Sequence, residues 1–219
     1  MTQSGLITLL AKEMKSEDAQ RYCSMMAEIK ARQRLIKEVG EGRVPWFPQP
    51  ARVEFVYLQL RKVIELIAMG SLLANATAFS KVQSNIQTYW HAKNLLDDIE
   101  AINPDFYPKP IIQKPSQRPG VKMDWFERKD DFLTKDRFVT LYDKCGGIMH
   151  ARNPFAPEAD HAKLEEQGPK WHLWIVNLLT SHLIRLAGDP NLYLIQMGSE
   201  GASPTYTSFA PGLPPPQNG

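Results

Sequence analysis

The chain has 219 residues, of which 43% are hydrophobic and 23% are charged. Its 26 basic and 24 acidic residues leave a formal net charge of +2, so no strong overall field attracts nucleic acid or an anionic membrane. No apolar run approaches the roughly 18 residues of a membrane-spanning helix, and the first residues lack the pattern of a signal peptide. The two cysteines provide neither a disulfide framework nor a cysteine-based zinc site. We therefore expect a reduced, cytoplasmic protein without a membrane segment.

Apolar spacing predicts three helices in the first half of the chain. The first covers residues 16 to 40 and begins at Ser16, a residue type that caps helices. The second, about residues 50 to 75, is apolar nearly all round, which is typical of a central, buried helix. A third covers roughly residues 78 to 102. We expect the apolar central helices to support self-association.

The second half of the chain mixes extended and helical patterns. Residues 110 to 128 alternate between apolar and polar on either side of Pro119-Gly120, a pair that favours a type II turn, so they predict a β-hairpin. The pattern after the hairpin predicts a helix over 134 to 150, a polar loop with an acidic stretch from 158 to 166, a helix over about 168 to 187, and an extended segment over 191 to 210.

These elements together predict a mainly α protein, a bundle of about five helices with a small antiparallel β-sheet as an appendage. Residues 1 to 210 are expected to form one composite domain, and the proline-rich residues 211 to 219 a disordered tail. The expected helical core covers residues 16–102 and 134–187, and the expected β segments cover 110–128 and 191–210.

The segment at the end of the fourth helix contains the first candidate catalytic residues. His150 lies at the predicted helix C-terminus, and Arg152 follows within one turn. Such a pair can act as a general base and as a clamp on a phosphodiester. The structural alternative is that His150 caps the last carbonyls of the helix while Arg152 fixes the following loop.

The second candidate group lies on the predicted central helix. Glu54, Arg61 and Glu65 follow each other at spacings of seven and four, so they share one polar stripe. If the helix is buried, the stripe is either an ion network built around an Arg61–Glu65 pair or the wall of a cleft shared with His150. The candidate catalytic set is therefore His150, Arg152, Arg61 and Glu65.

Other sites receive less support from the sequence. His172 and His182 lie ten residues apart on the predicted last helix, too far for one metal ion to bind both directly. The chain has no HExxH or CxxC motif and no glycine-rich nucleotide loop, so neither a metal nor a cofactor is expected. Cys145 is expected to be a buried residue rather than a nucleophile paired with His150.

Basic residues are concentrated on the predicted hairpin, around Trp125 and Phe126. The mixture of cations and aromatic rings is compatible with a nucleic-acid surface. Basic residues also protect exposed strand edges from aggregation, and this explanation is the simpler one. The basic members are Lys109, Lys114, Arg118, Lys122, Arg128 and Lys129.

A central helix with Leu60-Arg61-Lys62-Val63-Ile64-Glu65, followed by a helix ending in Gly-x-x-x-His-Ala-Arg-Asn-Pro, resembles helical bacterial proteins of the HEPN-like kind. The resemblance covers about residues 50 to 187. It implies a helical bundle, often dimeric, and in many members an RNase of a toxin–antitoxin or phage-defence system. The family's Arg and His, close together on one helix, are absent here. Arg137 precedes His150 by thirteen positions, so no catalytic pair is carried over.

Two functions follow from the sequence. The first is a helical interaction or regulatory protein, of a bacterial defence or toxin–antitoxin type, that binds a second copy of itself or a partner protein. The alternative is a divergent metal-independent ribonuclease that uses His150 and Arg152, with RNA as its partner. The sequence leaves open whether the protein is an enzyme.

Overall fold

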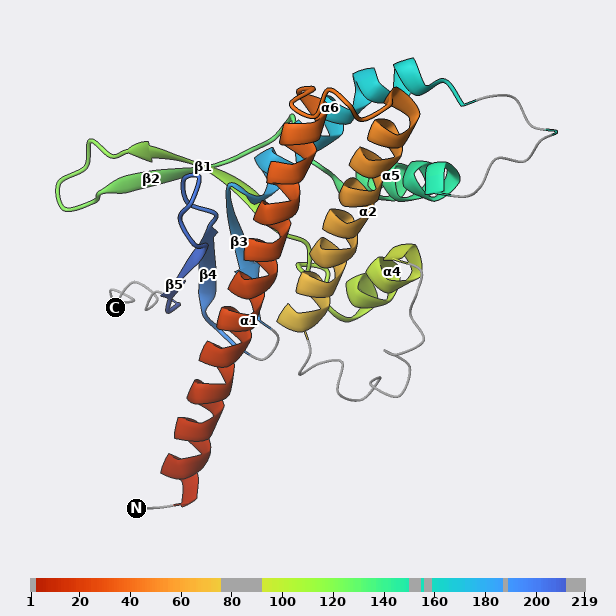
Figure 1. Cartoon of the computed structure of the whole chain (residues 1–219). Coiled ribbons are helices and arrows are strands. Elements are labelled where there is room, and N and C mark those ends of the chain that lie inside the picture. The colour runs from red at the N-terminus through yellow and green to blue at the C-terminus, as the bar shows by residue number, and fades with distance from the viewer. Residues whose placement is uncertain (1–2, 76–91, 150–154, 156–158, 187–188, 212–219) are drawn as a thin grey trace.

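Figure 1 shows the computed structural model, which describes residues 3–75, 92–149, 155, 159–186 and 189–211. These residues form five helices and one five-stranded antiparallel sheet, which confirms the predicted helical fold with a small sheet. The helices are α1 (Gln3–Gly40), α2 (Gln49–Ala74), α4 (Ala92–Ile102), α5 (Lys135–Met149) and α6 (His161–Leu179). The strands are β1 (Lys109–Pro115), β2 (Met123–Glu127), β3 (Ser181–Arg185), β4 (Leu192–Gln196) and β5 (Thr205–Phe209), in the spatial order β2-β1-β3-β4-β5.

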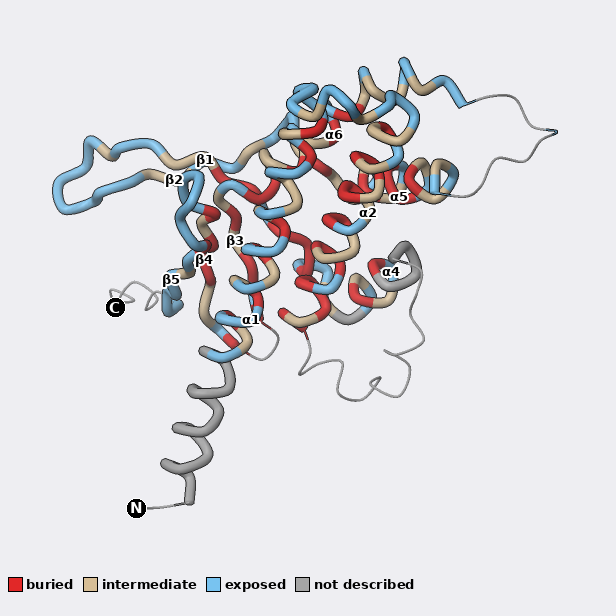
Figure 2. Tube along the Cα trace, in the orientation of Figure 1, coloured by how far each residue is buried: buried red, intermediate tan, exposed pale blue. Residues whose placement is uncertain are grey.

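The long helix α1 separates the sheet from helices α2, α4 and α5 (Figure 1). Helix α2 packs against all four other helices, and its Leu60, Val63 and Ile64 are fully buried (Figure 2). The prediction of a central, buried helix is therefore confirmed. Because other helices of the same chain already cover these side chains, they do not form the surface for self-association that the sequence suggested.

A buried hydrogen-bonded pair joins α1 to the sheet. The Tyr22 hydroxyl lies 3.0 Å from Nε2 of His182, and Nδ1 of His182 lies 2.9 Å from the Leu179 carbonyl. Because a carbonyl only accepts, the ring proton must be on Nδ1, and Nε2 accepts from Tyr22. Gly70 of α2 lies against the same tyrosine, since an added Cβ there would be 3.0 Å from the ring.

The sheet bends sharply at β1. Only Lys109 and Pro110 pair with β3, while the rest of the strand pairs with β2, so the β1–β2 hairpin projects from the body of the molecule (Figure 1). The bend brings Trp125 of β2 onto Phe209 of β5, with ring centroids 4.9 Å apart. The two edge strands of the sheet therefore contact each other through these rings.

The predicted helix over residues 168 to 187 is wrong at both ends. α6 already begins at His161, because Asp160 caps it by accepting a hydrogen bond from the Lys163 N–H at 2.9 Å. The acidic stretch predicted as a loop is therefore largely helical. Gly168-Pro169 resembles a helix start in the sequence, but in the structure it lies inside the helix.

At its other end α6 stops at Leu179, and residues 181–185 form β3 instead of a last helical turn. A short apolar run such as this one fits a helix or a buried strand equally well by periodicity. Residues 181–185 form a strand because all five of them pair with β4, and this strand lies in the middle of the sheet.

The other predicted helices and strands agree with the structure, apart from their boundaries, where they lie among the described residues. The hairpin and the extended segment over 191 to 210 are confirmed as β1–β2 and β4–β5. The first helix is longer than predicted, since α1 begins at Gln3. Of the helix predicted over 78 to 102, only α4 belongs to the described residues, and of the predicted tail only Pro211 does.

Candidate functional site

The structure brings two of the four predicted catalytic residues together. Arg61 and Glu65 lie one turn apart on α2, and Nε of Arg61 donates to a carboxylate oxygen of Glu65 at 2.7 Å. The predicted ion pair is therefore confirmed. The ammonium group of Lys62 lies 3.4 Å from the other oxygen of the same carboxylate.

Arg61 is also held by α5. Its guanidinium lies over the Tyr142 ring, 3.3 Å from the centroid, and donates to the Tyr142 carbonyl at 3.1 Å. Cys145, in the next turn, is fully buried, and burial raises the pKa of its thiol to about 12, which makes it a poor nucleophile. The contacts of Arg61 thus join α2 to α5, as the structural alternative expects.

The other two predicted catalytic residues, His150 and Arg152, lie outside the described residues. α5 ends at Met149, directly before His150. Upstream of it, Gly146 lies against Arg61, since an added Cβ there would be 3.6 Å from a guanidinium nitrogen. The last two turns of α5, which directly precede His150, therefore lie beside Arg61.

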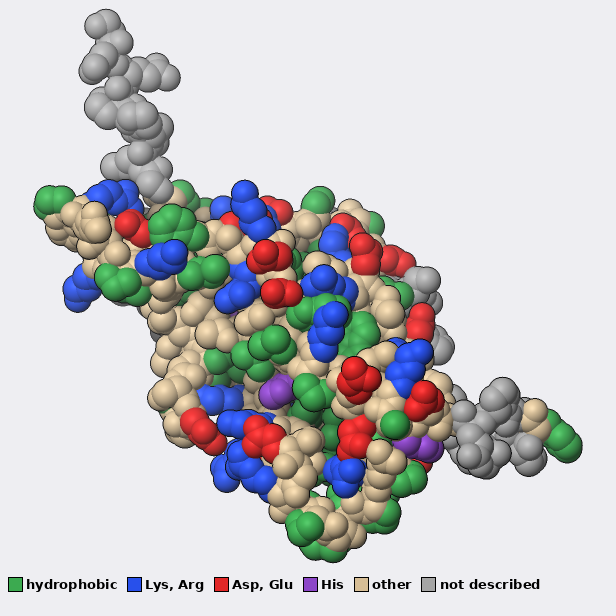
Figure 3. Space-filling model, turned by 90° about the horizontal axis from the view of Figure 1, so that it is seen from above, with side chains coloured by type: hydrophobic (Ala, Val, Ile, Leu, Met, Phe, Trp, Pro, Cys, Tyr) green, Lys and Arg blue, Asp and Glu red, His purple; other side chains and the backbone are tan. Residues whose placement is uncertain are grey.

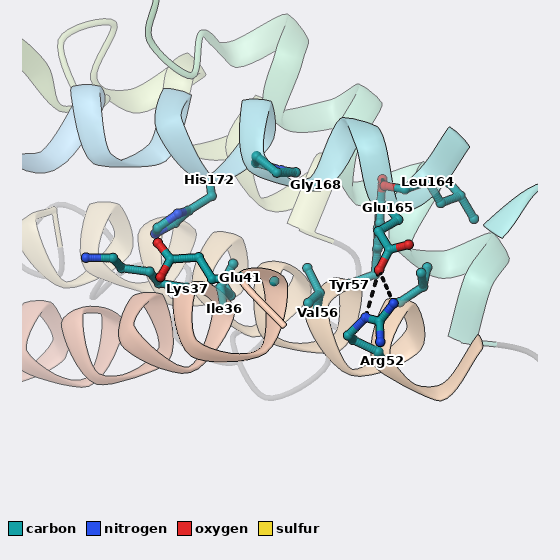
Figure 4. Close-up of a pocket in the computed structure, with 13 residues that line it drawn as sticks. Ile36, Lys37, Glu41, Arg52, Val56, Tyr57, Leu164, Glu165, Gly168 and His172 are labelled. Atoms are coloured by element: carbon teal, nitrogen blue, oxygen red, sulfur yellow. Dashed lines mark hydrogen bonds and ion pairs between the residues drawn. The ribbon is translucent and has the colours of Figure 1, made fainter. Parts of the chain in front are cut away.

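A cavity of about 130 Å³ lies where α1, α2 and α6 meet (Figure 4). Its walls are mainly apolar, and polar side chains stand at its two ends. The apolar lining consists of Ile36, Val53, Val56, Leu164 and Pro169. The sequence does not predict this cavity, because its residues come from three helices that are far apart along the chain.

The local sequence of α6 explains why space remains between the helices. Gly168 has no side chain, and a Cβ there would contact Val56 of α2 at 3.5 Å. Pro169 lacks a backbone N–H, so the Glu165 carbonyl loses its helical partner and the proline ring disturbs the turn before it. The two residues interrupt the regular surface of α6 where it crosses α2.

One end of the cavity is closed by a polar cluster. Arg52 of α2 donates from Nε to Glu165 of α6 at 2.7 Å, and Gln49 donates to the other oxygen at 2.7 Å. The hydrogen bond from Gln49 and the Arg52 cation lower the pKa of Glu165. The Tyr57 hydroxyl donates to the Leu164 carbonyl at 3.0 Å. These polar groups have partners within the fold and fix the start of α2 against α6.

His172 of α6 stands at the other end of the cavity and points toward Lys37 of α1 and Glu41, the first residue after α1 (Figure 4). Its Nε2 atom is buried and has no hydrogen-bond partner among the described residues. Burial and the nearby Lys37 cation lower the pKa of the imidazole, while Glu41 raises it. Nε2 of His172 is therefore a buried polar atom that the described residues leave unsatisfied.

The projecting hairpin offers a second, open surface. Hydrophobic and basic side chains occur together at this end of the molecule (Figure 3). Phe126 is 50% exposed, and the Lys114 ammonium lies 5.5 Å from the centroid of its ring. Val121 and Met123 are also exposed. Arg118 pairs with Asp124, so part of the predicted basic surface is neutralised within the hairpin.

Comparisons with known proteins leave the site to be interpreted from its own geometry. No protein-family model, curated protein or solved structure shows significant similarity to this chain. Within the part of the chain that the structure describes, no three His, Cys, Asp or Glu side chains gather as a metal ion would require. None of the described helices is long and apolar enough to cross a membrane.

Proposed function

We propose that this protein is an interaction module that binds an extended, acidic segment of a partner protein along the free edge of β2. The observation that carries the proposal is the β1–β2 hairpin, which projects from the body and has β2 at the end of the sheet. An exposed strand edge of this kind is a template for an additional strand.

The backbone of β2 has hydrogen-bonding groups available on that edge. Ser116 N donates to the Lys122 carbonyl and Arg128 N donates to the Pro110 carbonyl, both at 3.1 Å. Backbone groups alternate in direction along an antiparallel strand. The N–H and C=O groups of Met123, Trp125 and Glu127 therefore point away from β1, toward an incoming strand.

The charge and the side chains of the hairpin favour an acidic polypeptide. Six basic and two acidic residues lie between positions 109 and 129. Two identical hairpins would repel each other, whereas an acidic segment would be attracted. Exposed Met123 and Phe126 lie on opposite faces of β2, so they supply apolar contacts for side chains on both faces of the added strand.

RNA, the alternative partner, finds less support on this surface. Single-stranded nucleic acid is held by aromatic rings on which successive bases stack. Here Trp125 is contacted by Phe209, and Lys114 lies over Phe126, so the hairpin presents no open row of rings. The ribonuclease alternative depends on His150 and Arg152, outside the described residues. A role in bacterial defence or a toxin–antitoxin pair would follow from the identity of the partner.

The test selects a phage-displayed library of random peptides on the immobilised full-length protein. We expect enriched peptides to combine apolar and acidic residues. The variant Glu127→Pro removes one outward N–H, at a position where an edge strand tolerates proline. It should weaken the binding of a selected peptide about tenfold, the cost of one lost hydrogen bond.

The control variant Glu127→Ala removes the side chain but keeps the N–H, so it should bind the peptide nearly as the wild type does. Equal binding by wild type and Glu127→Pro, or the absence of any enriched peptide, contradicts the proposal. Preferential binding of single-stranded RNA to the same hairpin would favour the nucleic-acid alternative instead.

A further inference from the structure

Strand β5 forms the second free edge of the sheet, at the opposite end from β2. We infer that two copies of this chain associate there, by pairing their β5 strands antiparallel about a two-fold axis at Ser208. Among the described strands only β4 pairs with β5, and most residues of β5 are exposed (Figure 2). This surface is separate from the β2 edge, so the inference goes beyond the proposed function.

The backbone of Ser208 offers hydrogen-bonding groups on this open edge. Met197, the residue after β4, donates its N–H to the Thr180 carbonyl at 3.1 Å, on the β3 side of β4. Because backbone groups alternate in direction along a strand, Leu194 faces the other way and bonds to Thr207 of β5. Ser208, the next residue, therefore directs its N–H and C=O away from β4. Two copies that meet at Ser208 can exchange these hydrogen bonds with each other.

The side chains of β5 lack the features that keep exposed strand edges apart. Natural edge strands are protected by charged residues, especially Lys, or by Pro. β5 has the sequence Thr-Tyr-Thr-Ser-Phe, which contains neither and favours a strand. No charged residue occurs between positions 201 and 219. A second copy therefore meets no like charge along this strand, whereas two basic hairpins at β2 would repel each other.

The antiparallel arrangement suits the sequence on both sides of Ser208. A two-fold axis makes the contact self-complementary, so each residue lies opposite the one equally far from the axis. Thr207 of one copy then faces Phe209 of the other, and pairs of β-branched and aromatic residues stabilise antiparallel strands. Pro211 faces Thr205 at a position without ladder hydrogen bonds, so its missing N–H does not interrupt the pairing.

The contact between β5 and the hairpin leaves this edge open. Trp125 lies on the ring of Phe209, with the centroids 4.9 Å apart. Side chains stand on the faces of a sheet, whereas the groups that pair with a new strand lie in its plane. Phe209 itself remains 38% exposed beside Trp125. The hairpin therefore covers part of one face of β5 and not the backbone groups of Ser208.

The test measures the mass of the full-length protein by sedimentation equilibrium over a range of concentrations. One strand edge is small beside the roughly 1,600 Å² of a stable interface, so we expect a reversible equilibrium between monomer and dimer. The variants Ser208→Lys and Ser208→Glu each place like charges opposite one another, and each should weaken dimerisation about tenfold or more. An equimolar mixture of the two should dimerise again, because Lys then lies opposite Glu.

The mixture separates a lost contact from a lost fold, since misfolded variants would not restore each other's association. The control variant Ser208→Thr keeps an uncharged side chain that favours strands, so it should dimerise nearly as the wild type does. Glu127→Pro, at the β2 edge, should leave the mass unchanged. The inference is overturned by a wild type that stays monomeric, by equal dimerisation of wild type and Ser208→Lys, or by a mixture that stays monomeric. Peptide binding at β2 does not involve Ser208, so these results would leave the proposed function unaffected.

Discussion

His172 and His182 are ten residues apart, yet their surroundings differ in kind. His182 on β3 is fully buried, and both of its ring nitrogens have partners, the Tyr22 hydroxyl and the Leu179 carbonyl. His172 on α6 lines a cavity, and its Nε2 has no partner among the described residues. A satisfied buried histidine holds elements together, whereas a buried ring nitrogen without a partner adds no hydrogen bond to the fold. The difference separates a histidine that stabilises the fold through both ring nitrogens from one whose Nε2 makes no hydrogen bond to the described residues.

The largest expected effect comes from removing the satisfied histidine. His182→Leu leaves the Tyr22 hydroxyl and the Leu179 carbonyl buried without partners, so we expect a loss of about 3 kcal/mol in the free energy of unfolding. Urea denaturation followed by circular dichroism measures it. The double variant Tyr22→Phe/His182→Leu should recover part of the loss, because one orphaned group is then removed. A loss below about 1 kcal/mol would contradict the structural role of the pair.

Acid should weaken the fold through the same residue. Burial lowers the pKa of His182 from 6.5 to about 4, so the unfolded chain takes up this proton before the folded one. The contribution of neutral His182 to the free energy of unfolding is complete above about pH 6.5. It is lost as the pH falls toward about 4, by on the order of 3 kcal/mol in total. Urea unfolding at a series of pH values tests this. The variant His182→Leu should show a clearly shallower decline, and an equal decline in both proteins would contradict the assignment.

A smaller effect is expected when the contact next to the pair is disturbed. In Gly70→Ala the new Cβ would lie 3.0 Å from the Tyr22 ring, so the ring must move and weaken its bond to His182. We expect a loss of about 1 to 2 kcal/mol in the free energy of unfolding. Gly147→Ala is the matched control on α5, where no atom lies within 4 Å of the added Cβ and alanine favours the helix by up to about 1 kcal/mol. Equal effects of the two substitutions would argue against a close contact at Gly70.

The smallest effect on stability is expected at the unsatisfied histidine. His172→Leu removes an atom that makes no hydrogen bond within the described fold, so the free energy of unfolding should stay within about 0.5 kcal/mol of the wild type or rise. Thermal and urea denaturation both measure it. A loss as large as that of His182→Leu would mean that His172 has a structural partner, and the contrast between the two residues would disappear.

The parts of the fold that could be predicted from the sequence are those with a strong local signal. The buried helix α2 and the hairpin around Pro119-Gly120 were predicted because their patterns are long or their turn chemistry is specific. The strand β3 was not, since its five residues follow a helix directly and depend on pairing with β4, a tertiary effect. That error placed His182 on the same helix as His172 and concealed the difference between them.

The candidate sites also differ in whether the sequence alone could predict them. The Arg61–Glu65 pair could be predicted, because its two members lie one turn apart on one helix. The cavity could not, since its lining comes from α1, α2 and α6 and depends on how these helices cross. The only local signal was Gly168-Pro169, which also fits the start of a helix. An unsatisfied atom such as Nε2 of His172 is visible only once the packing around it is known.

The most direct test measures the ¹⁵N chemical shifts of both histidine rings near neutral pH. We expect His182 to show the Nδ1–H tautomer and a hydrogen-bonded Nε2, because both of its nitrogens have partners within the fold. The Nε2 resonance of His172 should be that of a ring nitrogen without a hydrogen bond. The Nε2–H tautomer at His182, or a hydrogen-bonded Nε2 at His172, would contradict the central claim that the fold satisfies both nitrogens of His182 and leaves Nε2 of His172 without a partner.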